Sequence, residues 1–237
     1  MQNGAPGTTR DGIVSIESAP IDDRIAMENR WDTGRTEAFS DGVFAVAITL
    51  LVLDIDVSPD SHGHFLRAIA DEWPSYLGFA TSFLTVGALW MAHHSMFRRL
   101  RYGNSAVIRL NLFLLMAVSF LPFPTRLVAE AIKSDSDERV AVIFYGLTLF
   151  VITALFAALW AVVVRDGGLL REEVTEDEAR RIMLAATPSL GFYAGIILLA
   201  ILLPKVAAFG LLAIAIIAIV RVREDPAQAR DPERDDE

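Results

Sequence analysis

One stretch of the sequence, residues 140–164, runs for 25 residues without a charged side chain. A helix rises about 1.5 Å per residue, so about 20 apolar residues cross the hydrocarbon core of a bilayer, which is roughly 30 Å thick. Five further segments have similar character, at residues 36–55, 73–97, 105–125, 182–203 and 206–222. The chain is therefore expected to be all-α and polytopic, an integral membrane protein with six transmembrane helices.

The composition agrees with a bilayer as the main partner. Of the 237 residues, 53% are hydrophobic, and the mean hydropathy of +0.41 is high for a soluble domain. The net charge of −9 comes from acids in tails and loops, and the densest basic run, Arg98-Arg99-Leu100-Arg101, abuts an apolar segment, so no nucleic-acid partner is expected. The absence of cysteine excludes disulfides, thiolate metal sites and cysteine nucleophiles.

The loop charges predict the orientation. Fifteen Lys and Arg residues fall in the two tails and in the loops after the second and fourth segments, against five in the other loops. The positive-inside rule then places both termini in the cytoplasm, which an even number of helices requires, and the expected location is a bacterial plasma membrane. We expect disordered cytoplasmic tails at residues 1–34 and 223–237, flanking a six-helix domain at 35–222, because both tails are charged and poor in aromatic residues.

The first helix has two different faces. At about 100° per residue, Val46, Leu50 and Leu53 fall within roughly 60° of one another and form an aliphatic stripe. Such a stripe fits helix packing or lipid contact as well as a functional surface. Asp41 points roughly 140° away from Val46. Because a charge that faces lipid costs several kcal/mol, Asp41 is expected to meet other helices or a cavity.

Other polar side chains are predicted at the same depth as Asp41. The second helix carries Trp90, His93 and His94 near its cytoplasmic end, and the third helix begins there. We therefore expect one polar layer between the helices, formed by Arg35, Ser40, Asp41, Trp90, His93, His94, Arg109 and Asn111.

The two histidines leave several roles open. Adjacent residues on a helix point about 100° apart, so His93 and His94 are a poor pair of metal ligands and no metal site is expected. A hydrogen-bonded structural role and a proton-sensing role both remain, because imidazole titrates near neutral pH. No Ser/His/Asp arrangement, phosphate-binding loop or zinc-protease helix occurs in the sequence, so an enzyme is not expected.

These motifs resemble the transmembrane-protein-175 family, the endosomal and lysosomal potassium channels and their bacterial relatives. The similarity covers residues 35–222 and is specific in the first three helices. With one Phe-Ser-Asp motif and six expected spans, the chain is similar to the bacterial branch, which the family assembles as homotetramers, whereas animal members carry two copies. The matching residues are Arg35 with Phe39-Ser40-Asp41-Gly42, the run from Leu89 to Phe97, Asn111-Leu112, and Leu121 to Thr125.

The resemblance implies roles for the first helix. Val46, Leu50 and Leu53 match the family's pore-lining positions, where four first helices surround an axis and form a hydrophobic gate, and Thr49 matches its hydroxyl layer. The polar layer is implied to brace this helix from behind. Val46 is smaller than the Ile or Leu typical of the narrowest ring, so the pore width is expected to differ.

The sequence therefore predicts a channel permeable to potassium and other monovalent cations, with no cofactor. Asp54 and Asp56 lie at the outer end of the first helix. They either attract cations to the outer mouth of the pore or merely keep this end of the helix in water. Two other functions remain open. One is a proton-coupled secondary transporter that uses Asp41 and the histidines, and the other is a non-conducting membrane scaffold.

Overall fold

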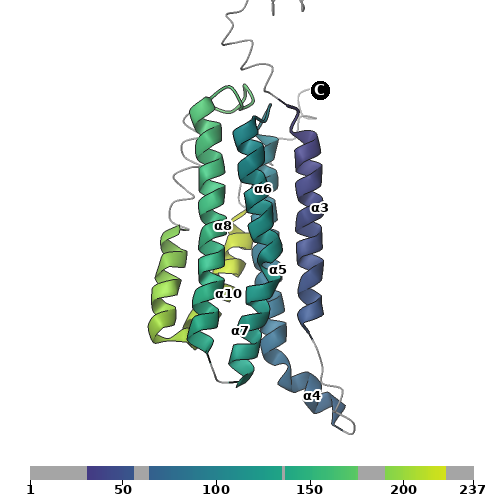
Figure 1. Cartoon of the computed structure of the whole chain (residues 1–237), viewed down its shortest axis with the longest axis vertical. Helices are drawn as coiled ribbons and strands as arrows, with labels where there is room; N and C mark the ends of the chain where they lie inside the picture. Colours follow the sequence, from purple (N-terminus) through teal and green to yellow (C-terminus); the bar gives the residue numbers. More distant parts are fainter. Residues whose placement is uncertain (1–30, 56–63, 135–136, 176–189, 223–237) are drawn as a thin grey trace, which may run out of the picture.

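The computed structural model describes residues 31–55, 64–134, 137–175 and 190–222, and regular structure within these ranges is helical. Four stretches are long and apolar enough to cross a membrane. They stand side by side as an upright bundle (Figure 1). The expected all-α, membrane-spanning architecture is therefore confirmed for the described part of the chain. The four stretches are Gly34–Asp54, Trp73–Arg98, Ser105–Ser134 and Glu138–Asp166.

The first, second and fourth spans begin and end close to their expected limits. The first consists of α3 (Gly34–Leu50) and a short 3₁₀ turn, η1 (Leu51–Asp54). The second is α5 (Trp73–Arg98), whose first turn contains a proline, where the missing N–H costs no helical hydrogen bond. The fourth is α8 (Glu138–Asp166), which ends at Gly167 with a positive φ of 60°.

The third span is longer than expected. It consists of α6 (Ser105–Phe120) followed end to end by α7 (Pro122–Ser134), so it continues well past residue 125. The two prolines of the Leu-Pro-Phe-Pro-Thr segment lie in the first turn of α7, where proline is tolerated, and they therefore restart a helix rather than end one. The predicted end at residue 125 is wrong, because α7 continues to Ser134.

The last two expected spans are described only in part. A helix from Leu190 to Leu202 lies within the expected segment 182–203, and residues 182–189 lie outside the described ranges. α10 (Pro204–Val222) follows and packs against α5 and α8. The apolar cores of both helices are shorter than those of the four spans. Most of the two predicted tails, residues 1–30 and 223–237, also lies outside the described ranges, whereas residues 31–34 are part of the structure.

Backbone pairing joins three segments at one end of the bundle. Trp31 and Gly103 exchange two N–H···O bonds of 2.9 Å, and a second bridge pairs Leu100 with Leu170. Asn104 caps α6 by accepting hydrogen bonds from the backbone N–H groups of the next turn. The start of α3, the loop after α5 and the loop after α8 therefore lie at the same end, as the loop charges predicted.

A short helix, α4 (Phe65–Asp71), lies at the other end and leaves the bundle at an angle (Figure 1). A single residue, Glu72, separates it from α5. The core of the protein lies between α3, α5, α6 and α8, where large apolar side chains are fully buried. These include Phe44, Val86, Phe97, Leu114 and Ile152.

Candidate functional site

The first helix is packed on one face and bare on another. Its packed face is formed by Ser40, Phe44, Ala47 and Leu51, each at most 1% exposed, which follow one another at helical spacing. This face lies against α5 and α6. The aliphatic stripe lies outside that contact, with Val46, Leu50 and Leu53 exposed by 57%, 41% and 73%. The chain by itself therefore leaves the predicted pore-lining residues uncovered.

A row of small residues runs beside the aliphatic stripe. Ala38, Gly42, Ala45 and Thr49 recur at spacings of four, three and four, and all four are exposed. A methyl group added at Gly42 would meet no atom of another described helix or loop within 4 Å. In membranes, rows of this kind let two helices approach closely.

Thr49 uses its hydroxyl hydrogen within its own helix. Its Oγ1 donates to the carbonyl oxygen of Val46 at 2.9 Å, while the side chain stays exposed. The oxygen therefore keeps its lone pairs on the uncovered side of α3.

Three buried polar side chains join α3, α6 and α5 in one hydrogen-bonded chain. His93 Nε2 donates to Asn111 Oδ1 at 2.8 Å, and Asn111 Nδ2 donates to Ser40 Oγ at 3.0 Å. Ser40 in turn donates to the carbonyl oxygen of Thr36 at 2.7 Å. All three side chains are at most 1% exposed. Because buried polar groups are costly unless they are paired, this chain fixes how α3 sits against the bundle.

His93 is enclosed by aromatic rings. It stacks on Phe97, with ring centroids 4.3 Å apart, and Phe44 and Phe156 lie against it at 5.3 and 6.1 Å. Its Nδ1 has no hydrogen-bond partner among the described residues. Across those residues, no group of three His, Cys, Asp or Glu side chains is placed to hold a metal ion. The surroundings of His93 therefore fit a structural role better than a metal ligand.

A second, half-exposed set of contacts links α3 to α5. Trp90 Nε1 donates to Asp41 Oδ1 at 2.8 Å, and His94 Nδ1 lies 2.9 Å from Glu37 Oε1. Trp90 and His94 stack on each other, with centroids 5.8 Å apart. Glu37 was missed by the sequence reasoning, although it precedes Asp41 by one helical turn and so shares its face.

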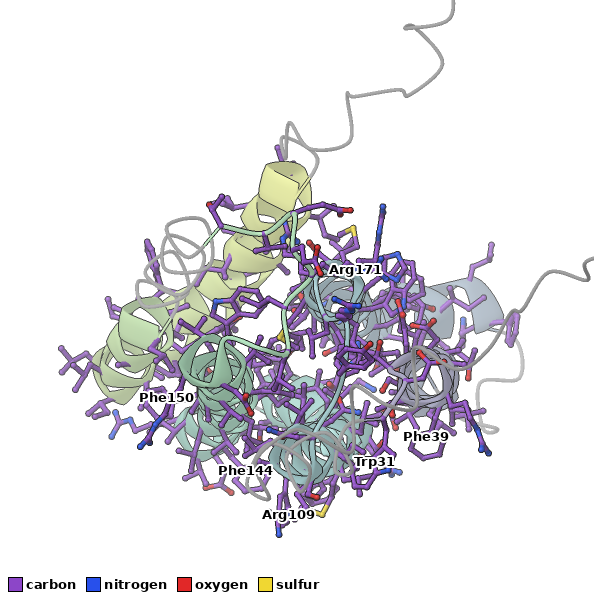
Figure 2. All side chains as sticks on the ribbon, turned by 90° about the horizontal axis from the view of Figure 1, so that it is seen from above. Trp31, Phe39, Arg109, Phe144, Phe150 and Arg171 are labelled. Carbon is purple, nitrogen blue, oxygen red and sulfur yellow. The ribbon has the colours of Figure 1, made fainter. Side chains whose placement is uncertain are left out.

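The structure does not bring the two predicted arginines into the layer. Arg109 is exposed and lies at the edge of the bundle when it is viewed from above (Figure 2). It is two positions from Asn111, so the two side chains leave α6 about 160° apart. Arg35 is exposed as well, and no hydrogen bond or ion pair joins it to the described members of the layer. The structure shows no contact between Arg109 and the described members of the layer, so its place in that layer stays a prediction.

The outer end of the first span faces α7. Asp54 is partly buried, and the charges nearest to its carboxylate are those of Arg126 and Glu130. Arg126 and Glu130 themselves form an ion pair of 2.7 Å on the exposed side of α7. Asp56, the other predicted acid of the outer mouth, lies outside the described residues.

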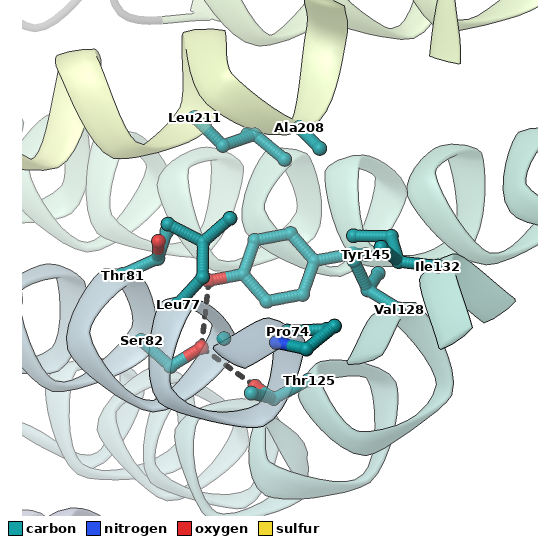
Figure 3. Close-up of a pocket in the computed structure, with 11 residues that line it drawn as sticks. Pro74, Leu77, Thr81, Ser82, Thr125, Val128, Ile132, Tyr145, Ala208 and Leu211 are labelled. Atoms are coloured by element: carbon teal, nitrogen blue, oxygen red, sulfur yellow. Dashed lines mark hydrogen bonds between the residues drawn. The ribbon is translucent and has the colours of Figure 1, made fainter. Parts of the chain in front are cut away.

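A small, partly open pocket lies away from α3, between α5, α7, α8 and α10 (Figure 3). Its polar wall is another hydrogen-bonded chain. Thr125 donates to the carbonyl oxygen of Leu121 at 2.9 Å, so it accepts from Ser82 at 2.6 Å, and Ser82 accepts from Tyr145 at 3.0 Å. The wall is therefore occupied by helix-to-helix bonds, and this pocket does not extend to the aliphatic stripe.

These features define an α-helical integral membrane protein whose first span is braced by polar contacts on one face and uncovered on the other. Residues 35–122 match the model of the family described as endosomal/lysosomal potassium channel TMEM175. A potassium channel of Streptomyces collinus is 40% identical over 186 residues, which cover 77% of this chain and 90% of that protein. The chain belongs to the TMEM175 family, which is a family of ion channels and not of enzymes.

Two further relatives show how far the similarity extends. The crystal structure of a lysosomal potassium-selective channel TMEM175 homologue from Chamaesiphon minutus is similar, with a TM-score of 0.73 and 34% identity. The match covers 80% of this chain and 97% of that one. The human endosomal/lysosomal proton channel TMEM175 is 35% identical over 135 residues, which are 53% of this chain but 27% of the human protein.

Proposed function

We propose that the protein is a potassium-permeable cation channel in which the α3 helices of four identical chains surround a central pore. The observation that carries this proposal is the uncovered aliphatic stripe of Val46, Leu50 and Leu53 on a helix whose other face is locked into the bundle. The relatives named as potassium channels support the same function. The permeant ion is K⁺, and no cofactor takes part.

The surface of α3 supports assembly with identical chains. Lipid tails are as apolar as the stripe, so exposure alone does not favour a protein partner. The row of Ala38, Gly42, Ala45 and Thr49 beside the stripe does, because small side chains allow a neighbouring helix to approach closely. In a homotetramer, Ala38, Gly42 and Ala45 of this row contact the adjacent chain, and the aliphatic stripe faces the axis with Thr49 at its edge.

The proposed pore conducts through an apolar constriction. Rings of Val and Leu side chains offer an ion no ligand, so such a constriction closes by losing its water. Potassium gives up its hydration water more easily than sodium, and a narrow apolar ring therefore favours it modestly. Thr49 lies one residue before Leu50, so its hydroxyl oxygen is placed to contact the ion as the ion enters the ring of Leu50 side chains.

We infer the remaining topology from the charges and from the family. The channel domain comprises residues 35–222, with Leu190–Leu202 and α10 belonging to the fifth and sixth spans. The end of the bundle that carries Trp31, Gly103 and Leu170 faces the cytoplasm, because the basic loops lie there. Both termini are then cytoplasmic, and the membrane is the bacterial plasma membrane.

Potassium flux into liposomes that contain the purified protein tests the proposal. Leu50→Asn and Val46→Asn place an amide in the constriction, so each is expected to change the flux rate or the K⁺/Na⁺ preference by about tenfold. Val52→Asn is the matched control, because Val52 is 50% exposed but lies off the stripe. Equal flux for the wild type and both stripe variants would overturn the constriction.

The same liposomes separate the other two functions. Proton-coupled potassium uptake that Asp41→Asn abolishes, with flux insensitive to Leu50, would indicate a secondary transporter. A stable tetramer that conducts no ion at any voltage or pH would indicate a scaffold.

A further inference from the structure

The short helix α4 is amphipathic, and the described residues leave most of its apolar side uncovered. Phe65 and Leu66 are 61% and 84% exposed, and Trp73 at the start of α5 is 49% exposed. At about 100° per residue, Phe65, Leu66 and Ile69 fall within roughly 100° of one another on α4, whereas Arg67 and Asp71 point to the opposite side. Burying such an apolar face away from water would lower the free energy of the protein.

The depth of α4 in the membrane is set by its connection to α5. Glu72 alone separates α4 from Trp73, where the second membrane span begins. A helix of seven residues is about 10 Å long, so all of α4 lies within about 10 Å of the end of that span. The angle at which it leaves the bundle prevents it from extending straight into the water (Figure 1).

The side chains of α4 suit the boundary between lipid tails and headgroups. Tryptophan is enriched at this level of a bilayer, because its ring is apolar and its N–H is polar. An interfacial helix turns its apolar face toward the acyl chains and its charged face toward water, which is the division seen in α4. A bilayer is already present beside α4, because the membrane spans cross it and end at this level.

We propose that α4 is an interfacial lipid-binding helix. Phe65, Leu66 and Trp73 insert among the parts of the acyl chains that lie next to the headgroups, and Arg67 lies at the headgroups. The site takes phospholipid. It attaches the segment between the first and second spans to the membrane surface. This inference rests on the membrane spans and not on the proposed conduction, so it stands whether or not the protein passes potassium.

Site-directed labelling of the full chain tests the proposal cleanly, because the protein contains no native cysteine. Leu66→Cys is labelled with the environment-sensitive dye NBD in vesicles of phosphatidylcholine and phosphatidylglycerol. Leu66 makes little contact with the rest of the chain, so the substitution should not impair folding. Asp71→Cys, on the charged side of the same helix and with no part in the proposed lipid contact, is the matched control.

The proposal expects quenching of the Leu66→Cys dye by lipids with a nitroxide near the headgroup to exceed quenching by deep nitroxides by about twofold or more. Iodide in the water should quench the Asp71→Cys dye at least about threefold more than the Leu66→Cys dye. Equal iodide quenching at both positions would show that α4 lies in water. A Leu66→Cys dye protected from both lipid nitroxides and iodide would show that a second chain covers the helix. Either result overturns the proposal.

Discussion

Asn111 on α6 donates a hydrogen bond to Ser40 on α3 across 3.0 Å, and both side chains are almost completely buried. This bond joins the first helix to the bundle at the level where the third span begins. Because Asn111 also accepts from His93 at 2.8 Å, one amide group holds three helices in register.

Removing the partner of Asn111 should destabilise the monomer. Ser40→Ala leaves a buried amide donor unpaired, so the free energy of unfolding is expected to fall by about 1–3 kcal/mol. Thermal unfolding in detergent, followed by fluorescence, measures this change. The combination of Ser40→Ala with Asn111→Ala should cost less than the sum of the two single changes, because both remove the same bond.

The pair of Asp41 and Arg109 provides the matched contrast. The structure leaves Arg109 exposed at the edge of the bundle, far around α6 from the layer. The effects of Asp41→Asn and Arg109→Gln on stability should therefore add within about 0.5 kcal/mol. Strong coupling between them would contradict the arrangement of α6 described here.

Two glycines should separate assembly from folding. A Cβ added at Gly42 meets no other atom of the described residues within 4 Å, so Gly42→Leu should leave the unfolding temperature unchanged but reduce the proportion of the proposed tetramer, measured by native mass spectrometry. Gly78→Leu should lower the unfolding temperature and leave the proportion of tetramer among the folded molecules unchanged. A Cβ there would already touch Thr125 Cγ2 at 3.4 Å, so the remaining atoms of a leucine must displace their neighbours, and such overpacking costs about 1–3 kcal/mol.

A third glycine supplies the control for a bulky side chain in a membrane helix. Gly87 on α5 also has no atom within 4 Å of an added Cβ, but it does not belong to the small-residue row of α3. Gly87→Leu should preserve the tetramer. Equal loss of tetramer in the Gly42 and Gly87 variants would contradict the proposed contact along α3.

Charges at the outer end should tune conduction in opposite directions. Asp54 lies beside the Arg126–Glu130 pair of α7, so Asp54→Asn removes negative charge and Arg126→Gln removes positive charge near the proposed mouth. At about 20 mM salt, we expect roughly a twofold fall in potassium conductance for the first change and a similar rise for the second.

Salt provides the control for this electrostatic effect. In about 1 M KCl the screening length falls to about 3 Å, so both variants should conduct like the wild type. A difference that persists at high salt would mean that these side chains act on the structure of the mouth rather than on the local ion concentration.

The sequence was a good guide to the helices and a partial guide to their contacts. Four spans could be predicted because a bilayer requires long apolar segments, and this requirement leaves a clear mark on composition. The height of Ser40, His93 and Asn111 along their helices also followed from counting residues. The third span was predicted too short, because it was ended at residue 125 although α7 continues to Ser134.

The errors in the polar layer share a cause. Depth along a helix says nothing about direction around it, so Arg109 was placed with Asn111 although it lies on nearly the opposite side of α6. The contact of Glu37 with His94 depends on how α3 and α5 are rotated against each other, which one sequence does not specify. The aromatic enclosure of His93 by Phe44 and Phe156 likewise depends on tertiary packing.

The bond from Thr49 to the carbonyl of Val46 also has a consequence for the sign of the ions that pass. A hydroxyl that has given its hydrogen to the backbone can only accept. Four such oxygens around an axis would form a ring of hydrogen-bond acceptors. This ring can bind a cation and the hydrogens of its hydration water. It offers chloride no hydrogen-bond donor. Discrimination between cations and anions would then be built into this ring without any charged side chain.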